Sequence, residues 1–148
     1  MTMTITPTDA ELVALAAEAA THAYIPYSGF PVGAALLLED GRVVTGCNVE
    51  NAAFGSTLCA ERTAVTRAVV TRDMAEVDPD NPWDRPRIEA VAIVGLKAEP
   101  CFPCGACRQV LNEFGCSRII VSEAGHPRSY PFEKILPMSF GPEALDHQ

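Results

Sequence analysis

Two short segments of the sequence carry residue types that bind metal ions and move protons. They read CAER at 59–62 and PCGACR at 103–108. Three cysteine thiolates would leave one position of a tetrahedral zinc site open, and a catalytic zinc ion needs such a position to hold water. Glu61 lies two residues beyond its cysteine, where a carboxylate can work beside the metal. The pattern predicts Zn²⁺ held by Cys59, Cys104 and Cys107, with Glu61 as the catalytic proton carrier.

The cysteines also admit other interpretations. A Cys-x-x-Cys pair by itself is typical of redox proteins. Cys101, Cys104 and Cys107 form a C-x₂-C-x₂-C run, but the fourth cysteine with a following proline that a bacterial iron–sulfur site needs is absent. A closed structural zinc site with Cys101 as fourth ligand would leave Glu61 idle. Cys47 and Cys116 we expect to be small, buried apolar residues. None of the three histidines, His22, His126 and His147, shows paired metal-ligand spacing.

The ligands are expected at the beginnings of helices. Unpaired N–H groups and the positive end of the helix dipole favour thiolates there. Zinc with three thiolates carries a formal charge of −1, so nearby cations would help the site. Arg62 and Arg108 are the candidates to donate hydrogen bonds to the sulfur atoms, and Pro103 is assigned a supporting role beside them.

The elements that must position these residues can be placed from hydrophobic periodicity and turn residues. Helices are expected at Glu11–Tyr24 (with Asp9 as N-cap), Cys59–Val70 and Cys104–Gly115. Strands are expected at Val32–Glu39, Arg42–Val49, Ile88–Leu96, Ser117–Glu123 and Ser129–Phe132. Asp40-Gly41 predicts a two-residue hairpin between the first two strands. Helices alternating with strands predict an α/β sandwich of about five strands with helices on both faces.

Length, composition and net charge limit the kinds of protein that this chain can be. The 148 residues fit a single domain, 1–148, with 1–8 as a flexible N-terminal tail and 71–87 as a surface excursion. No apolar run is long enough to cross a bilayer and no secretory signal opens the chain, so a cytoplasmic protein is expected. The net charge of −8, with 11 Lys and Arg residues, argues against a nucleic-acid partner and allows a small neutral ligand.

Four sequence blocks together resemble one family. The blocks are YSGFPVGAA at 27–35, CNVENAAF at 47–54, CAERTA at 59–64 and PCGACRQ at 103–109. They are similar to the small homo-oligomeric cytidine deaminases of the three-cysteine zinc type, and the last two match the zinc-deaminase signature. The likeness runs from Tyr24 to Leu145. It implies a mixed five-stranded sheet and one Zn²⁺ per subunit. The stretch 71–87 departs from it by being longer than the usual link.

The resemblance also implies residues that bind a nucleoside. Asn48 and Glu50 would hydrogen-bond the ribose hydroxyls, Phe30 would stack near the pyrimidine, and the Ala52 backbone would lie by the base edge. Phe140 would reach into a neighbouring subunit's pocket, in a homotetramer with active sites near the subunit interfaces. Simpler roles stay open: Phe30 as core, Phe140 as a C-terminal anchor, and Asn48 and Glu50 as turn residues.

The expected reaction is hydrolytic deamination of cytidine and 2′-deoxycytidine to the uridine products, with release of ammonia, in pyrimidine salvage. Activated water attacks C4 of the ring while Glu61 first accepts and then delivers protons. A carboxylate at position 50 would repel a phosphate, which favours a free nucleoside. Other functions left open are deamination of another small heterocycle, such as a cytosine-containing antibiotic, a non-catalytic zinc scaffold, and a redox protein.

Overall fold

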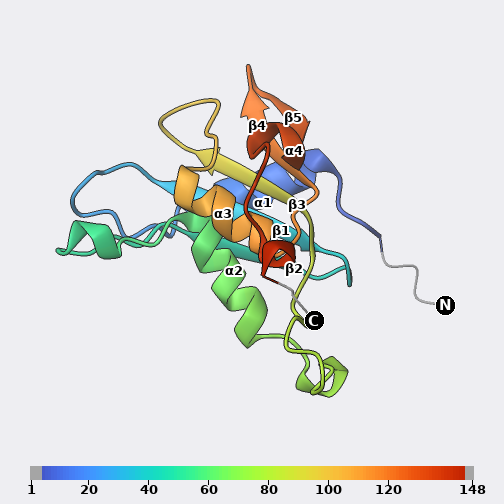
Figure 1. The fold of residues 1–148 in the computed structure, drawn as a ribbon. Coiled ribbons are helices and arrows are strands. Elements are labelled where there is room, and N and C mark those ends of the chain that lie inside the picture. The colour runs from blue at the N-terminus through green and yellow to red at the C-terminus, as the bar shows by residue number, and fades with distance from the viewer. Residues whose placement is uncertain (1–4, 146–148) are drawn as a thin grey trace.

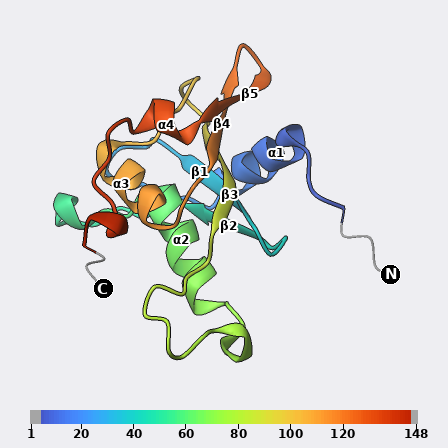
Figure 2. The same ribbon diagram turned by 45° about the vertical axis from the view of Figure 1, so that its right-hand side comes forward.

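The computed structural model describes residues 5–145 as a three-layer α/β arrangement (Figure 1). The helices and strands are α1 (Asp9–Ala20), β1 (Val32–Leu38), β2 (Val43–Cys47), α2 (Ala60–Val70), β3 (Ile88–Gly95), α3 (Gly105–Glu113), β4 (Arg118–Glu123), β5 (His126–Pro131) and α4 (Phe132–Ile135). Three short 3₁₀ turns, η1 (Phe54–Ser56), η2 (Met74–Glu76) and η3 (Pro142–Ala144), complete the described elements. Figure 2 shows α1 on one side of the sheet and α2 and α3 on the other.

The sheet is mixed, with the strand order β2-β1-β3-β4-β5. Strand β1 pairs antiparallel with both β2 and β3, β3 pairs parallel with β4, and β4 pairs antiparallel with β5. The single parallel pair follows from α3, whose passage across one face returns the chain in the same direction. The predicted fold class, a mixed five-stranded sheet with helices on both faces, is therefore confirmed.

Each face of the sheet has its own hydrophobic core. Successive side chains of a strand point to opposite faces, so β1 contributes Leu36 and Leu38 to one core and Ala35 and Leu37 to the other. The core under α1 includes Leu12, Ala16, Ala90, Ala92 and Ile120. The core under α2 and α3 includes Val65, Leu111, Val91, Ile93, Ile119 and Val121. Because both faces are covered, the central strands read as continuous apolar runs.

Two glycines let helices lie very close to the strands. A Cβ on Gly33 of β1 would lie 1.9 Å from the Ala16 carbonyl oxygen of α1. On the opposite face, a Cβ on Gly46 of β2 would lie 2.5 Å from the Ala64 nitrogen of α2. Only glycine allows this backbone approach. Gly46 thereby sets how deeply the first half of α2, which carries Glu61, packs against the sheet.

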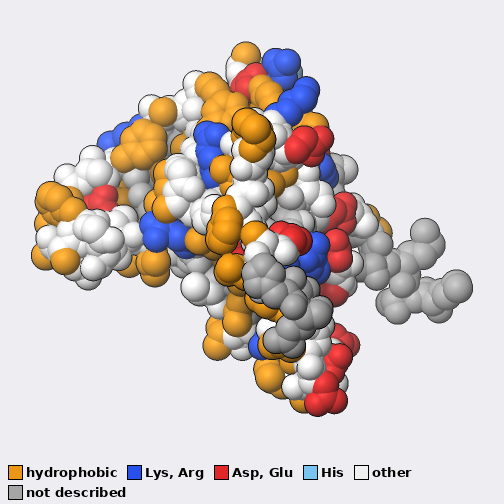
Figure 3. Space-filling view, in the orientation of Figure 1, with side chains coloured by type: hydrophobic (Ala, Val, Ile, Leu, Met, Phe, Trp, Pro, Cys, Tyr) orange, Lys and Arg blue, Asp and Glu red, His pale blue; other side chains and the backbone are white. Residues whose placement is uncertain are grey.

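The segment 71–87 follows α2 and lies at the surface. Most of its side chains are exposed, and Asp84 ties it together by accepting from the Asp78 N–H at 2.6 Å. Arg85 joins it to the end of α3 by donating to the Glu113 carbonyl oxygen. Acidic side chains gather on this part of the molecule, at the lower right of Figure 3.

No helix within residues 5–145 is long and apolar enough to span a membrane.

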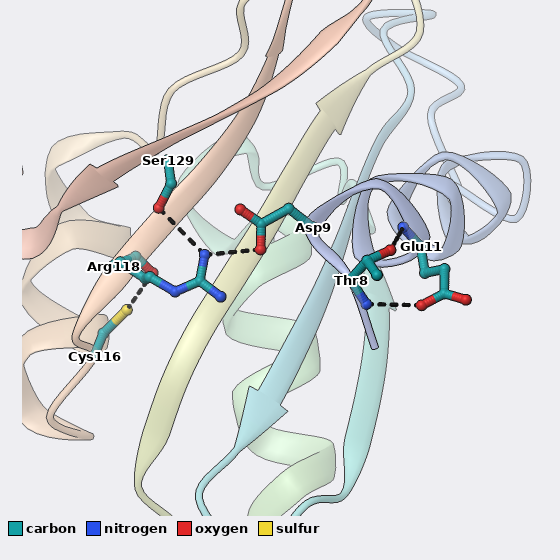
Figure 4. A network of polar contacts seen from close by, with 6 residues as sticks. All are labelled: Thr8, Asp9, Glu11, Cys116, Arg118 and Ser129. Atoms are coloured by element: carbon teal, nitrogen blue, oxygen red, sulfur yellow. Dashed lines mark hydrogen bonds and ion pairs between the residues drawn. The ribbon is translucent and has the colours of Figure 1, made fainter. Parts of the chain in front are cut away.

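Several predicted boundaries need correction. Helix α1 starts at Asp9 and ends at Ala20, and its N-cap is Thr8, not Asp9. The Thr8 hydroxyl accepts from the Glu11 N–H while the Glu11 carboxylate accepts from the Thr8 N–H, a complete capping box (Figure 4). Asp9 instead pairs with Arg118 of β4 at 2.9 Å. The reciprocal Thr8–Glu11 bonds fix the cap one residue earlier than predicted, and Asp9 is then available for the ion pair with Arg118.

The hairpin turns are also displaced from their predicted positions. The β1–β2 connection runs over the four residues 39–42, two more than predicted. The Gly41 N–H donates to the Leu38 carbonyl at 2.9 Å, and Gly41 has a φ of 89°. This is a turn closed by a left-handed glycine, which Asp-Gly suits equally well. The last hairpin turns at Ala124-Gly125, so β5 begins at His126 and not at Ser129. The chain trace of the proposed tail is described only from residue 5, and its flexibility stays a prediction.

Candidate metal centre and active site

Three cysteines come together at the N-terminal ends of α2 and α3. The Sγ atoms of Cys59 and Cys104 lie 3.8 Å apart, and those of Cys59, Cys104 and Cys107 all lie within 4.8 Å of one another. This is the one group of three or more potential metal ligands found within residues 5–145. Cys101, the alternative fourth ligand, does not belong to the group. Four-sulfur coordination is therefore not the arrangement that the described residues form.

The position of each sulfur follows from the place of its cysteine at the start of a helix. Cys59 is the N-cap of α2 and Cys104 is the N-cap of α3, both with extended backbone. Cys107 lies one turn into α3, and its N–H donates to the Cys104 sulfur at 3.5 Å. Such N–H groups have no partner inside a helix and stabilise negative charge. The predicted placement of the ligands at two helix beginnings is thus confirmed.

The three-thiol set fits a zinc ion. With a Zn–S bond of about 2.3 Å, two sulfurs of a tetrahedral site lie about 3.8 Å apart, which is the separation of Cys59 and Cys104. The Nε of Arg62 is buried and has no hydrogen-bond partner among the described residues. A guanidinium with an unused donor beside thiols suits a site that gains negative charge when its sulfurs ionise.

Glu61 is the one charged side chain that is fully buried among the described residues, with 4% of its surface exposed. It lies in the first turn of α2, and its Oε2 accepts from the Cys107 thiol at 3.6 Å. Burial of a charged carboxylate costs free energy unless the group is paired, hydrogen-bonded or protonated, so a buried acid beside thiols points to a function. The carboxylate therefore lies directly beside the sulfur cluster, in a place where it can take or give a proton.

The ionisable groups of the cluster have their pKa values shifted in different directions. The neighbouring Cys107 thiol, with contacts from Arg62 and Cys104, lowers the pKa of the Cys59 thiol to about 5. The proximity of Cys59, together with burial, raises the pKa of Cys107. Burial raises the pKa of Glu61, and the charge on Cys59 adds to that shift. One thiolate thus forms readily in this cluster even before a cation is bound.

The two arginines proposed to contact sulfur behave differently. Arg62 donates to the Cys59 sulfur at 3.5 Å and to the Thr57 carbonyl oxygen at 3.1 Å. Arg108 instead donates to the carbonyl oxygens of Pro103 and Ile135, at 2.9 and 2.7 Å, and not to a sulfur of the described residues. The sulfur contact expected for Arg108 is therefore wrong. Arg108 fixes the backbone of buried Pro103, the residue that leads into Cys104.

A short clamp links the metal ligands to the residues proposed to bind substrate. Val49 and Leu58 exchange two backbone hydrogen bonds, of 2.9 and 3.0 Å. On the other side, Tyr24 accepts from the Glu50 N–H at 2.9 Å and donates to the Asn48 carbonyl at 3.1 Å. The segment 48–50 is therefore held next to the residue that precedes Cys59, so the two predicted motifs share one framework.

Asn48, Phe30 and Glu50 form connected parts of that framework. The Asn48 side chain donates to the Phe30 carbonyl oxygen and accepts from the Val32 N–H, both at 2.9 Å. The Glu50 carboxylate accepts from the Tyr27 N–H at 2.8 Å and from the Ser28 hydroxyl. Phe30 is half-buried. The turn-stabilising role that stood as the alternative for Asn48 and Glu50 is thus real, whether or not they also contact a ligand.

The remaining predicted substrate residues lie at the surface. Ala52 is exposed in the loop that leads to η1, at the left of Figure 1. Phe140 is 61% exposed, and its carbonyl oxygen accepts from the side chains of Gln109 and Asn112, at 2.9 and 3.2 Å. These bonds anchor the backbone to α3 and leave the ring pointing into solvent in this single chain. The structure therefore does not bring either residue onto the sulfur cluster by itself.

The other cysteines and histidines follow the simpler interpretation in most cases. Cys116 is buried, and burial raises the pKa of its thiol to about 12. Cys47 is only half-buried, at the end of β2. His22 and His126 are exposed, and His147 lies outside the described residues. All six cysteines are free thiols.

Sequence reasoning missed the residues that support the site from its loops. Ser28 and Thr57, with Tyr27, Glu50 and Phe54, line a cavity of about 300 Å³. Tyr27 and Phe54 meet edge-on with ring centroids 5.3 Å apart. Tyr27 and Ser28 belong to the block at 27–35, but no spacing in the sequence indicates that they contact residues more than twenty positions away.

An α/β sandwich with a thiol trio at two helix beginnings and a buried carboxylate beside it defines a zinc-binding enzyme. Comparison with known proteins narrows this class. A family model for the cytidine and deoxycytidylate deaminase zinc-binding region matches residues 6–123. The chain belongs to this cytidine and deoxycytidylate deaminase family and is a hydrolase.

Individual relatives agree with the family assignment. A cytidine deaminase of Mycobacterium tuberculosis (strain CDC 1551 / Oshkosh) is 42% identical over 133 residues, which is 90% of each chain. One from Sporosarcina psychrophila is 40% identical over 140 residues, 93% of this chain and 94% of the relative. The crystal structure of cytidine deaminase from Burkholderia pseudomallei superimposes with a TM-score of 0.74 at 40% identity, over 90% of this chain and 100% of that one.

Proposed function

We propose that this enzyme removes the 4-amino group from cytidine and 2′-deoxycytidine by hydrolysis, in pyrimidine salvage. The observation that carries the proposal is the Glu61 carboxylate, buried and 3.6 Å from the Cys107 sulfur at the thiol cluster. Curated relatives at 40–42% identity over most of the chain carry the name cytidine deaminase. Both lines of support point to the same chemistry at the same place.

Each residue of the cluster has a defined part in the proposed reaction. Cys59, Cys104 and Cys107 would hold the zinc ion, which supplies a Lewis acid that lowers the pKa of a water molecule. Glu61 accepts a proton from that water and delivers it to ring N3, then takes the second proton from the new C4 hydroxyl and gives it to the departing amine. The water oxygen forms a bond to C4 and the C4–N bond breaks, so the products are the uridine nucleoside and ammonia. Arg62 offsets the negative charge of the three sulfurs.

The residues proposed to bind the sugar favour a nucleoside over a nucleotide. Glu50 lines the cavity of about 300 Å³ and would accept a hydrogen bond from a sugar hydroxyl. Its negative charge would repel a phosphate placed there. Asn48 holds the backbone of Phe30, whose ring is proposed to lie against the pyrimidine. Ala52 is proposed to bind the base edge through its backbone.

The proposed assembly is a homotetramer with active sites near the subunit interfaces. Phe140 is exposed and its backbone is fixed to α3, so its ring is presented outward, where a neighbouring subunit could receive it. We further propose a single domain over 1–148 and a cytoplasmic location. The free state of all six cysteines suits a reducing compartment.

One combined experiment tests the proposed function. Purified protein is analysed for zinc and then mixed with cytidine, deoxycytidine, cytosine or CMP while ultraviolet absorbance and ammonia are followed. The proposal expects one zinc per chain and turnover of both nucleosides, with CMP and cytosine far slower. Metal-free protein with full activity would contradict it. A bound zinc with no turnover of any of the four compounds would favour a scaffold or another heterocyclic substrate.

A further inference from the structure

The Glu50 carboxylate is held in one orientation by a neighbouring loop. Its Oε2 accepts from the Tyr27 N–H at 2.8 Å and the Ser28 N–H at 3.2 Å, and its Oε1 accepts from the Ser28 hydroxyl. These bonds span 22 and 23 positions of sequence, so they form only in the folded chain. The hydrogen bond from Ser28, with those from the two backbone N–H groups, lowers the pKa of Glu50. The carboxylate is therefore charged and fixed.

The Ser28 hydroxyl connects Glu50 to the rest of the proposed sugar and base site. It donates its proton to Glu50 and accepts from the Phe30 N–H at 3.0 Å. The carbonyl oxygen of Phe30 in turn accepts from the Asn48 side chain at 2.9 Å. One serine hydroxyl, with one donor and two acceptor positions, is thus the link between three residues proposed to bind the substrate.

The hydrogen bonds from Tyr27 and Ser28 also leave Glu50 able to bind a ligand. Tyr27 and Ser28 supply three donors, and the Ser28 N–H is shared between the two carboxylate oxygens at 3.2 and 3.3 Å. A carboxylate offers about four acceptor positions, so three donors do not exhaust it. Glu50 is half-exposed and lines the cavity of about 300 Å³ with Ser28, so a ligand in that cavity can reach the carboxylate. A carboxylate held in this way loses little side-chain freedom on binding, which favours affinity.

We propose that Ser28 is a positioning residue for substrate affinity: its hydroxyl orients the Glu50 carboxylate toward the sugar and ties that orientation to the backbone of Phe30. Ser28 acts through Glu50 and does not take part in the chemistry at the sulfur cluster. This inference rests on the proposed nucleoside substrate and on the contact of Glu50 with its sugar.

The test measures KM and kcat for cytidine with zinc-loaded variants. Ser28→Ala removes a hydrogen bond to a charged group, so KM should rise on the order of tenfold while kcat changes by less than about twofold. Ser28→Thr keeps the hydroxyl and should restore most of the affinity. The matched control is Ser122→Ala, because the Ser122 hydroxyl likewise donates to a carboxylate, that of Glu99, away from this cavity. It should leave KM unchanged.

A double mutant separates the two proposals. If Ser28 acts through Glu50, adding Ser28→Ala to Glu50→Ala should raise KM no further than Glu50→Ala does alone. Two outcomes would overturn the role of Ser28 and leave the sugar contact intact. In the first, the rise in KM of the double mutant equals the product of the two single rises. In the second, Ser28→Ala has a normal KM while Glu50→Ala has a raised one. If Glu50→Ala itself leaves KM unchanged, the sugar contact is wrong and the inference falls with it. Zinc content and thermal midpoints show whether each variant is folded.

Discussion

The first turn of α1 differs from the first turns of α2 and α3 in how its free backbone N–H groups find hydrogen-bond partners. Each helix begins with N–H groups that have no partner inside the helix. In α1, Thr8 and Glu11 satisfy them with a capping box. In α2 the N-cap is Cys59, which makes no capping hydrogen bond, and in α3 Cys104 offers only a sulfur acceptor at 3.5 Å. Cysteine is not among the residues preferred at this position.

The difference shows where local stability is given up for chemistry. The helix on the α1 face begins with a complete capping box. On the other face, the same positions carry thiols that converge on one point beside a buried acid. Exceptions of this kind to the local rules are expected at functional sites. Four substitutions test whether the starts of α2 and α3 serve metal binding and activity while the start of α1 serves stability alone.

Cys59→Ser should have the largest effect. Serine is a strong N-cap but replaces a thiolate ligand by a hydroxyl, so zinc content and activity should both fall to background. The metal-free variant should nevertheless be more stable than metal-free wild type, by about 0.5–2 kcal/mol. Zinc analysis, a cytidine assay and denaturant unfolding after chelation measure the three quantities. A variant that keeps its zinc and its activity would remove Cys59 from the ligand set.

Glu61→Gln should separate metal binding from proton transfer. The amide keeps the shape of the side chain but cannot carry the proton, so kcat should fall by about 10²- to 10⁴-fold while zinc stays bound. The exposed Glu133 of α4 provides the control, because Glu133→Gln removes the same charge away from the cluster. Steady-state rates with metal analysis check this. Near-normal turnover of the Glu61 variant would refute its catalytic role.

Arg62→Ala should weaken zinc binding without removing a ligand. The guanidinium donates to the Cys59 sulfur, and loss of such a supporting contact typically lowers metal affinity by about 10- to 100-fold. Arg67→Ala is the matched control, since Arg67 lies on the same helix and donates to the Thr45 carbonyl oxygen instead. Competition with a chromogenic chelator measures both affinities. Equal affinities in the two variants would show that the sulfur contact contributes nothing.

Thr8→Ala should have the smallest effect, and on stability alone. It removes one half of the capping box of α1, so the free energy of unfolding should fall by about 0.5–2 kcal/mol. The kcat and KM for cytidine should stay at wild-type values, because no residue of the sulfur cluster lies on α1. Thr8→Ser, which keeps the capping oxygen, should lose little stability. A loss of activity in folded Thr8→Ala protein would show that the two faces are coupled.

Much of the site could be read from residue types because its key positions are local. Cys59 and Cys104 fall at helix starts that the apolar periodicity and the flanking residues predict, and Glu61 and Cys107 follow within one turn. The element order and the two-faced sheet were predictable for the same reason. The N-cap of α1 was predicted wrongly at Asp9, although Thr8 with Glu11 three residues later is the local capping-box pattern. Only the ion pair of Asp9 with Arg118, 109 positions away, lies beyond local sequence.

The sequence by itself determined which residues this protein can use: three thiols, one carboxylate beside them, and strands and helices of the right length to carry them. Only the tertiary structure decided how they meet. Packing of α2 and α3 on one face of the sheet brings Cys59 within 3.8 Å of Cys104, across 45 positions of sequence. Tertiary packing also places Arg108 against the Ile135 carbonyl oxygen, 27 positions away, and Ser28 against Glu50, 22 positions away. Long-range contacts of this kind depend on how the elements pack, and local periodicity carries no information about them.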